Sequence, residues 1–181
     1  MNPMLRLLCG LPLALLLLLT GCDGDTFRLL ATVELVNRTG FTVEVLVGET
    51  LKVSRLPNGG TAEFETTSGR RPLLVRDLGT GLTIIEEQYR FRDDVTNRID
   101  LSDARAVLEL TQTADCCVRI RVDGRQVAEI GGVSTREVLV PAGTRSGEVL
   151  TGAGGLRRNE SRVFLTGGRT TVNLTAADCP D

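Results

Sequence analysis

Short stretches in which apolar and polar residues alternate, separated by turn sequences, run along the chain from about residue 29 onward. Between Cys116 and Val122 every second residue is apolar or a cysteine, whereas Arg119 and Arg121 fall on the opposite face. A period of two indicates a half-buried antiparallel strand. An Asp-Gly dipeptide follows at once and favours a tight hairpin turn. The same pattern predicts further strands at residues 126–130, 137–140, 148–150, 162–165 and 170–175.

The sequence repeats itself after about 75 residues. Segments 31–47 and 106–122 align without a gap and share five identities in 17 positions, and later strands match in the same order. Such repetition indicates a tandem duplication. The best helical candidate, residues 100–110, fits a strand between the repeats equally well. Because many short strands at this spacing are typical of sandwiches, we expect an all-β fold: two tandem, small antiparallel β-sandwich units, Ig-like in plan, at residues 29–103 and 104–181.

Residues 1–21 carry a different pattern. A single Arg6 precedes an apolar run of 13 residues from Leu7 to Leu19. As a helix this run rises about 20 Å, which is short of the roughly 30 Å hydrocarbon core of a bilayer. Its length and flanks are typical of a helical secretory signal peptide and not of a membrane-spanning helix.

The run ends in Leu19-Thr20-Gly21-Cys22, which resembles the bacterial lipobox of an aliphatic residue, two small residues and a cysteine. The resemblance implies a lipoprotein that is cleaved between Gly21 and Cys22. The Cys22 thiol would then carry a diacylglyceryl group, and the new amino group an acyl chain such as palmitate. The alternative is an ordinary secretory signal with a cysteine at this place by chance. Two or three acyl chains hold a protein firmly on a bilayer, so we expect a membrane-anchored protein on the periplasmic or outer-surface side.

Residues 22–28 are expected to form a lipidated tether. The six residues from Asp23 to Arg28 reach at most about 20 Å when extended, so the folded part should lie close to its membrane. Asp23 directly after the cysteine resembles the inner-membrane retention signal of enteric bacteria. Because that rule differs between lineages, Asp23 favours the inner membrane and leaves the outer membrane as an alternative.

Composition narrows the possible chemistry. The net charge of −2 gives no electrostatic support to a nucleic-acid partner. The chain has no histidine, which excludes Ser-His-Asp and Cys-His catalysis and histidine-containing zinc sites. We therefore expect no catalytic residues, no metal site and no cofactor, and we do not expect a small-molecule ligand.

The turn sequences of the second repeat resemble those of PEGA-type and carboxypeptidase-regulatory-like β-sandwich modules. The resemblance rests on Val122-Asp123-Gly124 after a first strand and on residues 140–144 and 165–174. It is weaker in the first repeat, where Val47-Gly48-Glu49 replaces the Val-Asp-Gly turn. It implies a non-catalytic module that presents a surface or spaces other domains.

Three cysteines remain once Cys9, in the signal, and the lipidated Cys22 are set aside. In an oxidising compartment they permit one disulfide and one free thiol. Strand parity places Cys116 inward and Cys117 outward, and continues the last strand to an outward Cys179. We therefore expect a Cys117–Cys179 disulfide, with Cys116–Cys179 nearly as well supported and a vicinal Cys116–Cys117 bridge less so. Metal binding or redox activity of these thiols is not favoured, because no Cys-x-x-Cys motif accompanies them.

Two further clusters could bind ions. Glu86-Glu87, Asp93-Asp94, Asp100 and Asp103 could supply oxygen ligands for Ca²⁺, but arginines interleave with them and no EF-hand spacing occurs. We favour a solvated, charge-paired strand edge. Residues 152–155, followed by Arg157-Arg158, could cradle an anion, but without a following helix they are more typical of a hairpin loop.

The sequence therefore favours a non-catalytic, lipid-anchored protein of the cell envelope that serves as a structural or protein-interaction module. Its expected partners are the membrane, through the anchor, and an envelope protein that the sequence does not identify. The alternative is a module that binds carbohydrate or peptidoglycan. Tyr89 and five phenylalanines supply few of the exposed rings that sugar sites use. An enzyme that works with carboxylates or serine alone is the third hypothesis.

Overall fold

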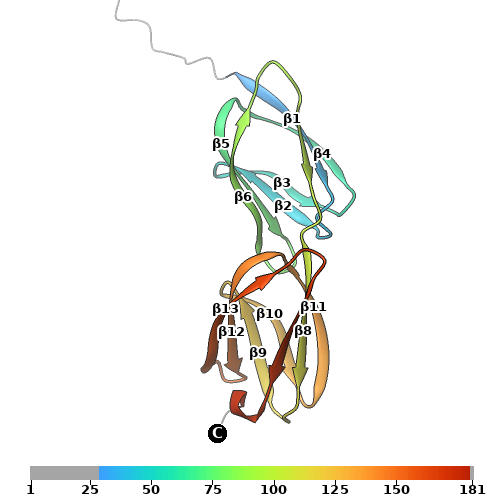
Figure 1. Ribbon diagram of the computed structural model, residues 1–181. Coiled ribbons are helices and arrows are strands. Elements are labelled where there is room, and N and C mark those ends of the chain that lie inside the picture. The colour runs from blue at the N-terminus through green and yellow to red at the C-terminus, as the bar shows by residue number, and fades with distance from the viewer. Residues whose placement is uncertain (1–28, 180–181) are drawn as a thin grey trace, which may run out of the picture.

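The computed structural model describes residues 29–179, and this part of the chain is built from β-strands. Its one helical element is a 3₁₀ turn, η1 (Ala176–Asp178). The strands form four small sheets in two similar units (Figure 1), which confirms the all-β prediction. Among residues 29–179, no helix has the length and apolar character needed to cross a membrane.

The first unit packs a three-stranded sheet, in the order β4-β1-β7, against a four-stranded sheet, in the order β3-β2-β5-β6. Alternating side chains of both sheets fill its core. Among them are Val33, Leu35, Val45 and Leu73, all fully buried. Its strands are β1 (Leu30–Asn37), β2 (Val43–Val47), β3 (Thr50–Leu56), β4 (Thr61–Thr67), β5 (Gly69–Asp77), β6 (Thr83–Phe91) and β7 (Asn97–Leu101).

The second unit repeats this plan strand for strand, with sheets in the orders β11-β8-β14 and β10-β9-β12-β13. The predicted duplication is therefore confirmed in the topology. Its strands are β8 (Arg105–Gln112), β9 (Cys117–Val122), β10 (Arg125–Gly131), β11 (Ser134–Pro141), β12 (Gly143–Thr151), β13 (Leu156–Phe164) and β14 (Arg169–Leu174).

The predicted alternation of buried and exposed residues and the predicted Asp-Gly turn are both confirmed at the first hairpin of the second unit. Val118, Ile120 and Val122 are buried, and the intervening side chains lie on the outer face. Asp123 and Gly124 both have positive φ, 46° and 72°, as the predicted tight turn requires. The helical alternative for residues 100–110 is wrong, since β7 ends within this segment and β8 begins in it.

One pair of strands in each unit departs from the antiparallel plan. β1 pairs with β7 in parallel, and β8 pairs with β14 in parallel, whereas all other strand pairs between residues 29 and 179 are antiparallel. A parallel pair needs a long connection between its strands. Here the connection is the rest of the unit, so the first and last strands of each unit lie side by side.

The units are arranged end to end, with the two ends of the described chain at opposite extremes (Figure 1). We call the extreme beside Leu29 the proximal end, the region between the units the joint, and the extreme beside Cys179 the distal end. The carbonyl of Leu29 accepts a hydrogen bond of 2.9 Å from the amide of Ser68, between β4 and β5. The chain therefore enters the fold at the proximal end of the first unit.

Candidate functional site

The predicted lipid-attachment and cleavage residues, Cys22 and Gly21, lie outside the described residues. The structure shows where the chain that follows them is held. Leu30 opens β1 opposite Thr67 of β4, next to the Leu29–Ser68 hydrogen bond. Any anchor at Cys22 would therefore connect to the proximal end through residues 23–28.

The joint contains an apolar side chain that passes from one unit into the other. Leu82, in the loop between β5 and β6, is 1% exposed and belongs to the buried cluster of the second unit, with Leu108 and Val122 among its members. The first unit thus completes the core of the second. Burying a leucine stabilises a fold by about 1.5–3 kcal/mol, so the apolar contact favours a fixed joint.

Asp77 shapes the loop that carries Leu82. Its carboxylate accepts hydrogen bonds from the amide of Gly79 at 3.1 Å, and from the amide and hydroxyl of Thr80 at 2.9 and 2.6 Å. Its own amide donates to the carbonyl of Leu82 at 2.9 Å. A buried carboxylate that satisfies the loop amides in this way holds Leu82 at the end of the first unit.

Arg145 supplies a polar link across the same joint. Its side chain is only 10% exposed and lies on β12 of the second unit. One Nη atom donates to the carbonyl of Thr83 in the first unit at 2.6 Å and to the carbonyl of Ala142 at 3.0 Å, while the other contacts a carboxylate oxygen of Asp123 at 3.0 Å. Hydrogen bonds from a charged donor are stronger than neutral ones.

The connection between β7 and β8 is also closely bonded. The amide of Ala104 donates to the carbonyl of Thr39 at 3.1 Å. Arg105 donates to Asp103 through Nε and Nη2 at 3.0 and 2.8 Å, and this contact lowers the pKa of Asp103 to about 2. Gly40 has a φ of 87°, which favours glycine, and a Cβ there would lie 2.1 Å from Cδ of Arg105. A larger residue would therefore strain the backbone and displace the Arg105 side chain.

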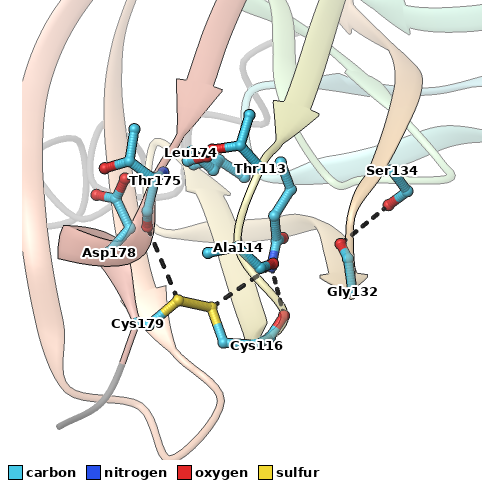
Figure 2. Close-up of a disulfide and its surroundings, with 10 residues drawn as sticks. Thr113, Ala114, Cys116, Gly132, Ser134, Leu174, Thr175, Asp178 and Cys179 are labelled. Carbon is cyan, nitrogen blue, oxygen red and sulfur yellow. Dashed lines mark hydrogen bonds between the residues drawn. A yellow bond between two sulfur atoms is a disulfide. The ribbon is translucent and has the colours of Figure 1, made fainter.

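The disulfide at the distal end joins Cys116 to Cys179, with their Cα atoms 5.8 Å apart (Figure 2). Our preferred pairing, Cys117–Cys179, is wrong, and the Cys116–Cys179 alternative is the one formed. Strand parity failed because β14 ends at Leu174 and the turn η1 follows, held by a 2.9 Å hydrogen bond from the amide of Thr175 to Asp178. The turn redirects the chain, so that Cys179 meets the inward-facing Cys116.

Cys117 is an exposed free thiol on the outer face of β9. Its Sγ lies 3.2 Å from a carboxylate oxygen of Glu129, and this contact raises the pKa of the thiol. A raised pKa lowers the fraction of reactive thiolate. The Glu129 contact therefore disfavours the thiolate form of Cys117.

The acidic residues do not converge. No group of three or more histidine, cysteine, aspartate or glutamate side chains within residues 29–179 could hold a metal ion. Charge pairing occurs for two of them, since Asp100 contacts Arg98 at 3.4 Å and Asp103 contacts Arg105 at 2.8 Å. Glu86-Glu87 lie on β6, the edge strand of its sheet. The predicted loop at residues 152–155 is the hairpin between β12 and β13.

Sequence reasoning missed Leu82 and Arg145. The duplication could have indicated Leu82, because Leu82 in the first unit corresponds to Gly155 in the second. The amide of Asp77 donates to the carbonyl of Leu82, and the amide of Thr151 donates to the carbonyl of Gly155. An apolar residue in one copy and a glycine in the other is the expected difference when only one copy has a neighbour beyond that loop. Arg145 gave no comparable signal.

No protein-family model and no curated protein matches the sequence. A solved structure described as "The Bacillus anthracis TIE protein" is similar to the chain with a TM-score of 0.33 and 11% sequence identity. The match covers 81% of this chain and 33% of that one, so the chain spans about a third of the protein it resembles.

Proposed function

We propose that the chain is a non-catalytic, lipid-anchored protein of the cell envelope, and that its two coupled β units present a surface to an envelope protein partner. The observation that carries this proposal is the end-to-end joint, in which Leu82 and Arg145 connect the units. Because the units are coupled, an anchor at the proximal end fixes where the second unit lies.

The reach of the tether supports a position close to the membrane. Six residues extend at most about 20 Å, whereas a nine-residue strand such as β5 is about 30 Å long. The tether is thus shorter than the unit that it holds. The first unit would remain within contact distance of the bilayer, and the second unit would be the part available to a partner.

The sugar-binding alternative gains no support from the aromatic residues. Phe41, Phe91 and Phe164 are buried, and Phe64 and Tyr89 pack against the core of the first unit. In the part of the chain that the structure describes, no aromatic side chain therefore forms the exposed platform on which sugars stack. Pelleting of the protein with purified peptidoglycan would restore this alternative.

Membrane fractionation tests the anchor. We expect the wild-type protein in the membrane pellet and the Cys22→Ser variant in the soluble periplasmic fraction, because serine cannot carry the thioether-linked diacylglyceryl group. Washing the pellet with high salt separates lipid anchoring from electrostatic adhesion. Equal retention of both proteins after washing would refute the proposal.

Site-specific photocrosslinking tests the partner. Val133, between β10 and β11 at the distal end, is 71% exposed, and Leu165, on the joint side of the second unit, is 69% exposed. A photoreactive phenylalanine at position 133 should crosslink one reproducible envelope protein in intact cells, and the same group at position 165 should not. Absence of a reproducible product from position 133 would contradict a partner at the distal end.

A further inference from the structure

A row of leucines crosses the outer face of the four-stranded sheet in the first unit. Leu46 on β2 pairs with Leu51 on β3 and with Leu74 on β5, so the three side chains lie next to one another on three adjacent strands. Their neighbours along the strands, such as Val45 and Leu73, point into the core. Leu51 is 51% exposed, and Leu46 and Leu74 are half-buried. The row therefore presents an apolar surface to solvent.

The second unit shows that the fold does not require this row. In the same register, Arg121 of β9 pairs with Gln126 of β10 and Glu148 of β12. Three leucines of the first unit thus correspond to three polar or charged residues of the second. Two copies of one fold differ here in surface chemistry, so the leucines serve the surface of the first unit and not its folding.

Two arginines extend the same face towards the proximal end. Arg70 on β5 lies directly opposite Arg90 on β6, and both are exposed. Like charges directly opposite each other on a sheet are destabilising, and within residues 29–179 neither arginine has an ion pair. Thr144 and Val163 occupy the corresponding positions of the second unit. The exposed Pro72 lies between the leucine row and the arginines.

Acidic residues lie near the arginines without forming a salt bridge to them within residues 29–179. Asp93 and Asp94 line one hollow with Arg90 and Arg92. Glu44 is paired with Arg76, at 3.6 Å. Glu86, opposite Leu74 on the edge strand β6, is an exposed carboxylate at the side of the row. The face is therefore apolar at its centre, and at the proximal end the three arginines Arg70, Arg90 and Arg92 outnumber the two aspartates. An apolar surface beside an excess of positive charge is the combination that binds anionic lipid surfaces.

We propose that this outer face, formed by Leu46, Leu51, Leu74, Pro72, Arg70 and Arg90, rests on the surface of an anionic phospholipid bilayer. The arginines bind lipid phosphates, and the leucines contact the boundary between headgroups and acyl chains. The inference rests on the proposed lipid anchor. The location of the face supports contact with the membrane. Ser68 bonds to Leu29, where the chain enters the fold, and lies two residues from Arg70. A tether of at most about 20 Å holds this face near the lipid.

The test compares two topologically matched positions in the lipidated protein. Leu51→Cys and Gln126→Cys, each combined with Cys117→Ser, are labelled with an environment-sensitive fluorophore and reconstituted in vesicles. The vesicles contain phosphatidylcholine alone or with about a third phosphatidylglycerol, plus a lipid that carries a quencher near the headgroup. With phosphatidylglycerol present, we expect at least about twofold stronger quenching at position 51 than at position 126.

Charge variants connect the effect to the arginines. Arg70→Gln with Arg90→Gln should reduce the quenching at position 51 to the level at position 126. The matched control, Arg55→Gln with Arg121→Gln, alters two other exposed arginines and should leave the quenching unchanged. Equal quenching at positions 51 and 126 in the wild-type background would overturn the proposal.

Two further outcomes have separate meanings. Failure of the wild-type protein to float with vesicles of either composition would refute the lipid anchor itself. Self-quenching of the label at position 51 in detergent, rising with protein concentration, would assign the leucine row to a second copy of the chain and overturn membrane contact by this face.

Discussion

Asn37 and Gln112 occupy equivalent places in the two units, and each closes the loop that follows the first strand of its unit. The Nδ2 atom of Asn37 donates to the carbonyls of Phe41 and Leu56, at 2.8 and 2.9 Å. The Nε2 atom of Gln112 donates to the carbonyl of Ala114 at 2.8 Å and to that of Cys116. Both side chains are buried. The duplication therefore extends to the internal hydrogen bonds of the units.

Replacing Asn37 should destabilise the first unit. The Asn37→Leu variant leaves the carbonyls of Phe41 and Leu56 buried without these donors, which costs about 2–4 kcal/mol in the free energy of unfolding. Denaturant unfolding followed by circular dichroism measures the loss. Asn58→Leu is the matched control, because Asn58 is exposed and accepts a hydrogen bond from Gly40 alone among the described residues. A loss for Asn58→Leu as large as that for Asn37→Leu would contradict the role of Asn37.

Truncating Leu82 should weaken the second unit although the residue belongs to the first. Leu82→Ala opens a cavity in the second core and is expected to cost about 2–4 kcal/mol. Unfolding of the second unit can be followed through hydrogen exchange of β9 and β12. Leu78→Ala, in the same loop at 44% exposure, should cost less than about 1 kcal/mol. Loss of protection in the first unit alone would show that Leu82 does not couple the units.

The disulfide and the free thiol should differ in their effects on stability. Cys116 and Cys179 are separated by 63 residues, so removing the bridge with Cys116→Ser and Cys179→Ser should cost about 4 kcal/mol by the loop-entropy relation. Cys117→Ser should change the midpoint of unfolding little. Reductant should shift the midpoint of wild type and leave the double variant unaffected. Equal shifts in the two proteins would contradict the assignment of the bridge.

The contact between Asp103 and Arg105 should be visible in an acid titration. Arg105 lowers the pKa of Asp103 from 3.8 to about 2. A carboxylate with a lowered pKa in the folded state stabilises the protein above the unfolded value, and this contribution is lost as the pH falls from 3.8 towards 2. We expect carbon-detected NMR to place the titration midpoint of Asp103 near 2, and Arg105→Gln to raise it towards 3.8. Arg98→Gln is the control and should leave the midpoint unchanged. An unchanged midpoint in Arg105→Gln would show that another group lowers the pKa.

Much of the fold could be predicted because it follows from local patterns. Alternation fixes which side chains of β9 are buried, and the Asp123-Gly124 dipeptide fixes the turn that follows. The duplication then extends the assignment to the first unit, where Leu46 occupies the position that Arg121 has in the second unit. These features depend on residues close together in the sequence.

The remaining features depend on residues that are far apart in the sequence. Cys179 could not be paired correctly by parity, because the turn η1 changes the direction of the chain after Leu174. The joint was missed for the same reason: Arg145 bonds to Thr83, 62 positions away. The parallel pairing of β8 with β14 likewise joins the two ends of a unit. Such contacts are set by the packing of whole sheets.

The intact mass of the protein purified from membranes decides whether Cys22 carries a lipid anchor. We expect a protein that begins at Cys22 and carries the added mass of a diacylglyceryl group and an amide-linked acyl chain. The Cys22→Ser variant should lack this added mass. A wild-type protein cleaved elsewhere, or one with an unmodified Cys22, would refute the lipid anchor.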